Sequence, residues 1–150
     1  MECRDVMAPI QTSLFADDPA STAIDFMVEK HMGLVPVVDR EGVFVGLLSG
    51  DRLMNFMLPK QVSMMRGEKY ASYLRESPGE LRERLDELRK RPIGDLVDRF
   101  ASVAYPDTGL IDAMIKISEK QFVIPIVDRD NNKLVGAISF FSLLHALKEK

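Results

Sequence analysis

The sequence predicts an α/β protein built from two copies of one β-α-β-β-α unit, with a charged helical segment between them. The main observation is an internal repeat: residues 34–49 read LVPVVDREGVFVGLLS, and residues 123–139 read VIPIVDRDNNKLVGAIS. Both passages run apolar, Pro, apolar, Val, Asp, a polar turn, and then Val, Gly, two apolar residues and Ser. A second observation is that shorter patterns before each passage recur at nearly the same offset. Such self-similarity indicates a repeat architecture.

Each passage is predicted to form a strand, a tight turn and a second strand. The apolar runs are short, rich in β-branched residues and bounded by Asp and Gly, as expected for strands. The turns contain Glu-Gly at 41–42 and Asn-Asn at 131–132, which supply residues that tolerate the positive φ of a hairpin turn. Pro36 and Pro125 cannot donate to a sheet ladder, so we expect each at a strand start or a sheet edge.

In the first half, residues 12–15 are predicted to form a short strand. Asp18, followed by a proline, indicates a helix start, with a capping carboxylate and Pro at the first helical position. This helix is predicted to run to about His31 and to end at Gly33, and a second helix to begin near Gly50. The buried face of the first helix consists of apolar residues at helical spacing: Ala23, Ile24, Met27 and Val28.

The second half repeats this order. The lead-in 95–97 matches the lead-in 5–7, and 102–105 matches the first short strand, both at an offset of 90 residues. Residues 106–108 are predicted to open a helix, and a final helix is predicted over 141–148. The apolar side of the first of these helices carries Ile111, Met114, Ile115 and Ile117. Each half is therefore expected to be strand, helix, strand, strand, helix.

The segment 59–91 between the halves differs in composition. It holds nine basic and six acidic residues, a charge of +3, which leaves −6 for the rest of a chain with a net charge of −3. Residues 77–80 form a capping box with proline at the first helical position, and a less regular helix is predicted over 64–74. The leucines that follow the capping box at helical spacing need a covering surface, so we expect this helix to lie against the protein: Leu81, Leu85 and Leu88.

The overall composition excludes several classes of protein. A chain of 150 residues suits one compact domain or two small halves that share a core, here 1–58 and 92–150 with the insert 59–91. The net charge and the lack of a long basic block give no reason to expect nucleic acid as a partner. No apolar run approaches the roughly 20 residues that span a membrane.

The N-terminus lacks the charged-then-apolar pattern of a signal peptide. Cys3 is the only cysteine, so no internal disulfide can form, and a reducing, cytoplasmic location is expected. We expect Cys3 to be a free thiol in a mobile terminus. The two histidines, His31 and His145, stand in different elements with no further ligand at metal spacing, so neither a metal site nor a catalytic role is expected.

The repeated unit resembles the cystathionine-β-synthase-type (CBS) domain pair. The features that carry the resemblance are the apolar-Pro-apolar-Val-Asp strand and the Gly-apolar-apolar-Ser strand end, found once in 1–58 and again in 92–150. The resemblance implies two interlocked α/β repeats, packed as a pseudo-two-fold disc through their sheets. It also implies a homodimer formed through helices. The insert 59–91 lies outside the resemblance and is longer than the linker usual in the family.

The resemblance further implies no obligatory cofactor and a regulatory ligand containing adenosine: AMP, ADP, ATP or S-adenosylmethionine, bound between the repeats. In the family signature, a Ser or Thr hydroxyl beside a helix N-terminus favours phosphate, and an Asp three residues later binds the ribose. Backbone groups near the early strand and the Pro strand handle adenine. The candidate site residues are then Thr12, Pro36, Ser49, Arg52, Ser102, Pro125, Ser139 and Ser142.

Neither half carries the ribose carboxylate, because Arg52 and Ser142 occupy the Asp positions. Asp51 comes one residue early, and one residue turns a helix by about 100°, which makes Asp51 a poor substitute. The Arg52 guanidinium can instead pair with a phosphate. The alternative for Ser49 and Ser139 is that each only caps the helix that follows it. The two clefts are therefore expected to be unequal.

Two functions are compatible with these observations. The first is a regulatory module that senses an adenosine-containing nucleotide and signals through the shape of a dimer; the resemblance supports it and the missing carboxylates oppose it. The second is a ligand-free dimeric scaffold that engages an unknown protein through 59–91. An enzyme is not expected, since there is no nucleophile motif, phosphate-binding loop or metal cluster. We take the first function as the working hypothesis.

Overall fold

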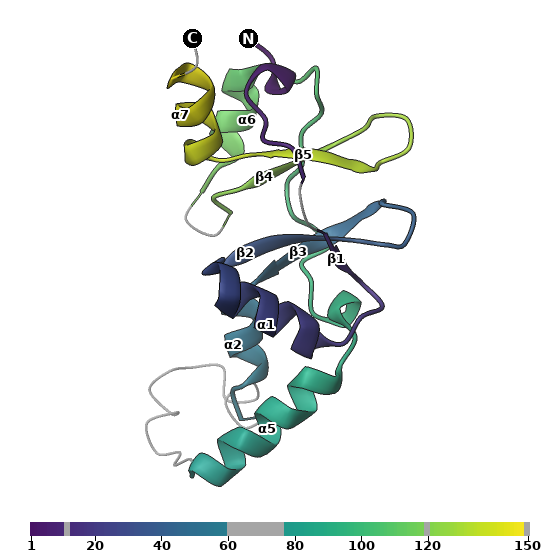
Figure 1. Cartoon of the computed structure of the whole chain (residues 1–150), viewed down its shortest axis with the longest axis vertical. Coiled ribbons are helices and arrows are strands. Elements are labelled where there is room, and N and C mark those ends of the chain that lie inside the picture. The colour runs from purple at the N-terminus through teal and green to yellow at the C-terminus, as the bar shows by residue number, and fades with distance from the viewer. Residues whose placement is uncertain (11–12, 60–76, 119–120, 149–150) are drawn as a thin grey trace.

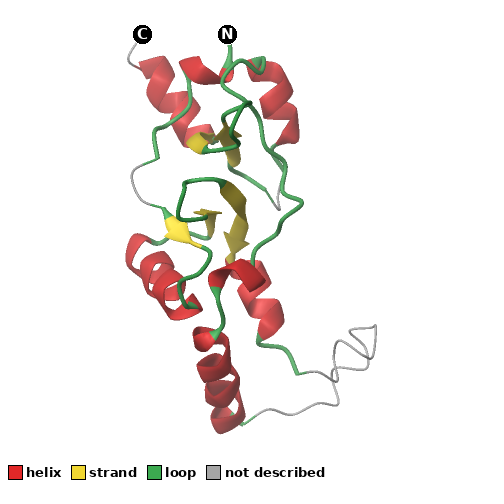
Figure 2. Cartoon of the chain, turned by 90° about the vertical axis from the view of Figure 1, so that its right-hand side faces the viewer, coloured by secondary structure: helices red, strands yellow, loops and turns green. Residues whose placement is uncertain are grey.

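The computed structural model describes residues 1–10, 13–59, 77–118 and 121–148. Its two α/β halves lie one above the other along the long axis of the molecule (Figure 1). The sheets lie in the middle and face each other, and the helices lie beyond them at both ends, as the second view also shows (Figure 2). Within the described residues, no helix is both long enough and apolar enough to span a bilayer.

Repeat one follows the predicted order. Strands β1 (Leu14–Phe15), β2 (Leu34–Val38) and β3 (Phe44–Ser49) form a sheet in the order β1-β2-β3. β1 is parallel to β2, and β2 is antiparallel to β3. Helices α1 (Ala20–Lys30) and α2 (Gly50–Phe56) cover the outer face of this sheet (Figure 1).

Repeat two has the same plan with one strand fewer. Strands β4 (Ile124–Val127) and β5 (Leu134–Ile138) form an antiparallel pair, and helices α6 (Leu110–Lys116) and α7 (Phe140–Lys148) lie outside it. Both hairpin turns have the predicted conformation: Gly42 has φ 89° and Asn132 has φ 60°.

The strand predicted over 102–105 is reduced to a single parallel bridge between Ala104 and Ile126. The reason is that side chains form hydrogen bonds with the backbone groups that a longer strand would use for pairing. The Gln121 carboxamide bonds both the N–H and the C=O of Ser102, and Lys116 Nζ donates to the Val103 C=O at 2.8 Å.

The two repeats exchange their lead-in segments. Ala8 exchanges backbone hydrogen bonds with Ala137 of repeat two, and Asp98 exchanges them with Leu47 of repeat one. The members of each pair stand 90 residues from their counterparts, so the exchange obeys the pseudo-two-fold relation. The halves are interlocked as expected, since each contributes a segment to the other.

Each lead-in also completes the core of the opposite repeat. This corrects the expectation that Cys3 lies in a mobile terminus. Cys3 is fully buried with Val6 in the core of repeat two, among residues that include Ile124 and Ile138. Its N–H donates to the Thr108 C=O at 2.9 Å, so the terminus is held in place. Burial raises the pKa of the Cys3 thiol, because a thiolate would be poorly solvated there. The equivalent lead-in segment places Ile93, Leu96 and Val97 in the core of repeat one.

Gly46 and Gly136 occupy equivalent positions in the two repeats, where the lead-ins cross the sheets. A Cβ at Gly46 would lie 2.5 Å from the Asp98 carbonyl oxygen, and a Cβ at Gly136 would lie 3.0 Å from the Ala8 carbonyl oxygen. The distance at Gly46 is shorter than real Cβ atoms allow, and the one at Gly136 is tighter than most real Cβ contacts, so glycine is favoured where each lead-in passes over the opposite sheet.

The prediction that the prolines lie at strand starts or sheet edges was wrong for Pro36 and is confirmed for Pro125, whose strand β4 is an edge of its two-stranded sheet. Pro36 is the third residue of β2, the central strand of its sheet, where it pairs with Leu47. Leu47 directs its N–H and C=O to Asp98, away from β2. The Pro36–Leu47 pair is therefore a non-hydrogen-bonded pair, in which the missing N–H of proline removes no ladder bond. Pro125 pairs with Ala137 in the same way in repeat two.

The helix starts after both lead-ins also differ from the prediction. α1 begins at Ala20 and has no side-chain cap, because the Asp18 carboxylate accepts a hydrogen bond from Arg40 instead. Its end is set by His31 in the left-handed conformation, φ 54°, rather than by Gly33. α6 begins only at Leu110, after a turn in which Thr108 Oγ1 accepts from the Tyr105 N–H.

The insert contributes helix α5 (Pro78–Lys90), capped by Ser77 as predicted. It lies against α1 of its own repeat, with Leu88 buried in the core of repeat one. Arg89 pairs with Asp25 of α1 at 3.2 Å, and Arg84 Nε donates to the Met57 C=O at 3.0 Å. The expectation that this helix lies against the protein is confirmed, but of its leucines only Leu88 is buried: Leu85 is half-buried and Leu81 is 41% exposed. The helix predicted over 64–74 lies outside the described residues.

Candidate functional site

Two clefts lie between the repeats. The smaller one has a volume of about 370 Å³ and is polar. Repeat one contributes the Ser49 hydroxyl and three side chains of α2, and the other side is formed by Asp98, Ser118 and Gln121. Its full lining is Leu34, Leu47, Ser49, Asp51, Arg52, Asn55, Asp98, Ser118 and Gln121.

Ser49 and Arg52 lie together in this cleft, as the sequence predicted. Ser49 is also the N-cap of α2, since its Oγ accepts a hydrogen bond from the Arg52 N–H at 3.1 Å. The Arg52 side chain is held by its Nε, which donates to the Leu96 C=O at 2.8 Å. The guanidinium is therefore held at the cleft wall by Leu96, which lies in the lead-in segment of repeat two.

Asp51 lines the same cleft as Arg52, although the two side chains were expected to point in different directions. The cleft wraps around the first turn of α2, so both positions reach it. The smaller cleft thus combines a guanidinium with the carboxylates of Asp51 and Asp98. Sequence reasoning missed Asp98, Ser118 and Gln121, because only the fold brings them beside Ser49.

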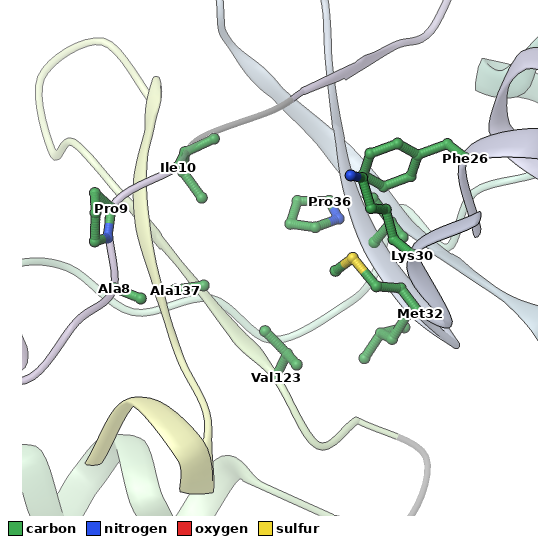
Figure 3. Close-up of a pocket in the computed structure, with 11 residues that line it drawn as sticks. Ala8, Pro9, Ile10, Phe26, Lys30, Met32, Pro36, Val123 and Ala137 are labelled. Atoms are coloured by element: carbon green, nitrogen blue, oxygen red, sulfur yellow. The ribbon is translucent and has the colours of Figure 1, made fainter. Parts of the chain in front are cut away.

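The larger cleft has a volume of about 600 Å³ and is mostly apolar. Figure 3 shows Pro9, Ile10 and Ala137 on one side and Phe26, Lys30 and Met32 on the other. Lys30 is the one charged side chain among the described residues of the lining. That lining is Ala8, Pro9, Ile10, Phe26, Lys30, Met32, Leu34, Val35, Pro36, Val123 and Ala137.

The clefts are pseudo-symmetric but chemically different, as the sequence predicted. Ala8 and Ala137 of the larger cleft are the counterparts, 90 residues away, of Asp98 and Leu47 of the smaller one. An exposed methyl group therefore replaces a carboxylate at the same place in the fold. Of the predicted site residues that the structure describes, only Pro36 lines the larger cleft.

Ser139 and Ser142 are not brought into either of the two clefts. Ser142 Oγ accepts from the Ser139 N–H at 2.9 Å and donates to the Ser139 C=O at 3.0 Å, while Ser139 Oγ accepts from the Ser142 N–H at 3.2 Å. Both hydroxyls thus bond the start of α7, which matches the helix-cap alternative.

Pro125 and Ser102 line neither cleft, and their backbone groups are bonded within the protein. The Pro125 C=O accepts from the Ala104 N–H at 3.0 Å, and the Pro125 side chain is buried. Both backbone polar groups of Ser102 are bonded by Gln121. Thr12 lies outside the described residues.

Two carboxylates in the loops beside the first strands have lowered pKa values, because an arginine pairs with each of them. In repeat one, Arg40 lies 4.2 Å from the Phe15 ring centroid and bonds Asp17; its hydrogen bond lowers the pKa of that carboxyl group. In repeat two, Arg129 lies 4.1 Å from the Tyr105 ring centroid and lowers the pKa of Asp107 in the same way. These pairs fasten the hairpin turns to the early strands.

The part of the chain that the structure describes contains no group of three or more His, Cys, Asp or Glu side chains that could hold a metal ion. The side chains that line the two clefts offer hydrogen bonding, charge pairing and apolar contact. Such groups bind and orient a small ligand.

The family model described as "CBS domain" matches the chain twice, over residues 3–59 and 93–149. A comparison with curated proteins gave no significant match.

Among solved structures, the fold is similar to that of CBSX2, a CBS-pair protein from Arabidopsis thaliana, with a TM-score of 0.71 and 22% identity over 99% of this chain and 94% of that one. CBSX2 in complex with AMP gives a TM-score of 0.68 and 22% identity, over 99% of this chain and 96% of that one. CbpB in complex with c-di-AMP gives a TM-score of 0.69 and 17% identity, over 99% of this chain and 85% of that one. Likeness at these identities establishes the shared fold.

Proposed function

Because the chain belongs to the CBS domain family and carries two copies of the domain, we propose that it is a regulatory module that binds an adenosine-containing nucleotide between its repeats. The observation that carries this proposal is the larger cleft, whose described lining is apolar apart from Lys30. A purine ring needs flat apolar walls, and a phosphate needs a cation. AMP, ADP, ATP and S-adenosylmethionine are the candidate ligands, and no obligatory cofactor is proposed.

The size and chemistry of the larger cleft support this assignment. A volume of about 600 Å³ lies within the range of roughly 300–1,000 Å³ that is usual for small-molecule sites. Ile10, Met32 and Pro36 would contact adenine, and Lys30 would pair with the phosphate. The structures of CBSX2 with AMP and of CbpB with c-di-AMP are further support, because proteins of the same fold bind adenine nucleotides.

The smaller cleft is the second candidate site. Ser49 and Arg52 would contact phosphate there, and the carboxylate of Asp51 would accept hydrogen bonds from ribose hydroxyls. The two acidic side chains, Asp51 and Asp98, oppose a polyphosphate, so this cleft should favour ligands with fewer negative charges.

Thermal unfolding of the purified chain with each of the four candidate ligands tests the function. A ligand that binds only the folded state, present at about 100 times its Kd, adds about 2.7 kcal/mol of stability. We expect a clear rise in Tm with at least one nucleotide and none with inorganic phosphate at the same concentration. An unchanged Tm with all four ligands at millimolar concentration would sink the nucleotide proposal.

We also propose that two chains form a homodimer through the outer face of α6 and α7, in a cytoplasmic module that signals by dimer shape. Taking roughly 200 Å² for each fully exposed large side chain, the exposed fractions on these helices amount to roughly 800 Å², close to the ~800 Å² per partner of a standard interface. Phe141 is 78% exposed and Ile115 is 76% exposed. The seven exposed apolar side chains are Ile111, Met114, Ile115, Phe140, Phe141, Leu144 and Leu147.

The ligand-free scaffold is the alternative function, with a protein partner engaged through 59–91. Since Leu88 of α5 is already buried against repeat one, such a partner would meet the charged side of this helix. Retention of partner capture after loss of nucleotide binding would favour this alternative.

A further inference from the structure

Arg52 brings the end of a guanidinium group to the smaller cleft. Its Nε donates to the Leu96 C=O at 2.8 Å, and no other described residue bonds the two terminal nitrogens of this side chain. Arg52 lines the cleft and is half-buried there. The terminal nitrogens of a guanidinium form a planar fork that binds a carboxylate through two parallel hydrogen bonds. The cleft therefore offers a prearranged partner for an anionic group.

Asp98 brings the opposite charge to the same cleft. Its N–H and C=O both bond the backbone of Leu47, at 2.8 and 3.1 Å, so the sheet of repeat one fixes its position. Its Oδ1 accepts from the Phe100 N–H at 2.9 Å, and in the part of the chain that the structure describes no donor bonds Oδ2. Asp51 adds a second, exposed carboxylate to the lining. The cleft therefore also offers a partner for a cationic group.

These charges share the cleft without neutralising each other. Arg52 forms no ion pair with either carboxylate among the ion pairs of the described residues. Arg52 and Asp98 are half-buried, so their charges are screened less than those of fully exposed side chains. A nucleotide phosphate would satisfy the guanidinium and be repelled by the two carboxylates. A ligand that carries an anion and a cation would satisfy both kinds of side chain.

The fold does not require this pair of charges. At the equivalent positions, 90 residues away, Ser142 stands for Arg52 and Ala8 stands for Asp98. Ser142 bonds the start of α7, and Ala8 makes the same backbone crossing as Asp98. Both charges are thus present in one cleft and absent from the other. This pattern is expected when the charges serve a ligand and not the fold.

We propose that the smaller cleft binds an α-amino acid group, with the ligand carboxylate on the terminal nitrogens of Arg52 and the ligand ammonium on Oδ2 of Asp98. Such a group carries both charges on one carbon atom, which suits a small cleft. Asp51 disfavours any further negative charge on the ligand. The apolar part of the lining, Leu34 and Leu47, suits an uncharged side chain. The inference rests on the proposed function, since it takes the clefts between the repeats as ligand sites, and it replaces phosphate by a carboxylate as the anion on Arg52.

Isothermal titration of the full chain with L-methionine, S-adenosylmethionine and AMP tests the inference and separates two sources of the amino acid group. Binding of L-methionine would identify a free amino acid as sufficient. Binding of S-adenosylmethionine without binding of L-methionine would identify the amino acid end of a nucleoside ligand. In either case, loss of the carboxylate, in L-methioninol or in decarboxylated S-adenosylmethionine, should weaken binding at least tenfold, because the bidentate contact is lost.

Two variants assign the binding to the smaller cleft. Arg52→Gln and Asp98→Asn should each weaken it by about tenfold or more, since each removes one charge-assisted contact. Asp98→Asn keeps an oxygen that can accept from the Phe100 N–H, so it is the variant expected to preserve the local structure. Asp130→Asn, at an exposed turn position of repeat two, controls for the loss of a negative charge and should bind like the native chain.

Two results would overturn the amino acid site and leave the nucleotide function intact. One is unchanged affinity in both folded variants or for the decarboxylated ligands. The other is no binding of L-methionine or S-adenosylmethionine by a chain that binds AMP. Absence of binding by all of these ligands and by ADP and ATP would overturn both proposals.

Discussion

The outer helix faces of the two repeats differ, although the repeats share one plan. In repeat one, α5 lies on α1, with Leu88 buried and Arg89 paired with Asp25. In repeat two, no described element covers α6 and α7, where Ile115 and Phe141 are more than three-quarters exposed. The interiors follow the same apolar pattern, so the comparison teaches that the repeats diverged at their surfaces. The insert covers part of the outer face of repeat one with α5, and it leaves the apolar side chains on α6 and α7 of repeat two exposed.

The clefts show the same divergence. The counterpart positions 8 and 98 carry Ala and Asp, and the resulting clefts are apolar and polar respectively. The lead-in backbones cross the sheets alike in both repeats, so a change of side chain alters the cleft without altering the fold. Matched substitutions at counterpart positions can therefore separate shared structure from divergent function.

The largest expected difference concerns the lead-in residues in the cores. Ile93→Ala should lower the free energy of unfolding by about 3 kcal/mol, since it empties a fully buried site. Cys3→Ala, its counterpart, removes one sulfur and should cost about 1 kcal/mol. Urea denaturation at fixed protein concentration measures both. Equal losses would contradict the unequal contribution of the two lead-ins.

The crossing glycines should come next. Gly46→Ala should cost about 2–3 kcal/mol, because the new Cβ would meet the Asp98 backbone oxygen at 2.5 Å. Gly136→Ala should cost about 1 kcal/mol, since its nearest neighbour is the flexible Met7 side chain at 2.9 Å. The same denaturation assay ranks the pair. A reversed ranking would show that the two crossings do not differ as the distances indicate.

The exposed faces can be compared by their effect on assembly. Phe141→Glu should place a charge in the proposed dimer interface and weaken dimerisation by at least tenfold, measured by sedimentation equilibrium. Met54→Glu, at an exposed position of α2 in repeat one, is the matched control and should leave the dimer intact. A monomeric native chain, or equal weakening by both variants, would contradict an interface formed by α6 and α7.

The smallest expected difference is in the acid range. Because Arg40 and Arg129 lower the folded-state pKa values of Asp17 and Asp107, the stabilisation is present above the ordinary carboxyl pKa of about 4 and is lost as the pH falls through the lowered values. Arg129→Ala should flatten this acid limb of a stability–pH curve, and high salt should do the same in the native chain, since the pair is exposed. An unchanged acid limb in Arg129→Ala would show that the pair does not contribute.

Local patterns predicted much of this fold. Turn residues, the Ser49 and Ser77 caps and the two hairpins depend on interactions within a few positions, and the structure confirms them. The burial of Cys3 could not be predicted in this way, because most of the core residues around it lie more than 100 residues along the chain. Pro36 was misplaced for a similar reason: whether its missing N–H matters depends on Asp98, which takes the bonds of Leu47.

The candidate site was predictable only in part. Ser49 and Arg52 belong to one repeated motif and do share a cleft. Ser139 and Ser142 satisfy each other at the start of α7, a local outcome that the motif alone does not reveal. Lys30 and Gln121 carry no motif, and they become candidates only when the fold places them at the clefts.

The most direct test of the central claim is isothermal titration of AMP into the native chain, Lys30→Ala and Lys148→Ala. Lys30 lines the larger cleft, whereas Lys148 is an exposed lysine at the end of α7 and controls for the loss of one positive charge. If a nucleotide binds in the larger cleft, Lys30→Ala should weaken AMP binding by about tenfold or more, as expected for a charge-assisted contact to phosphate, and Lys148→Ala should bind like the native chain. AMP binding that is equally strong in all three proteins would contradict the assignment of the nucleotide to this cleft.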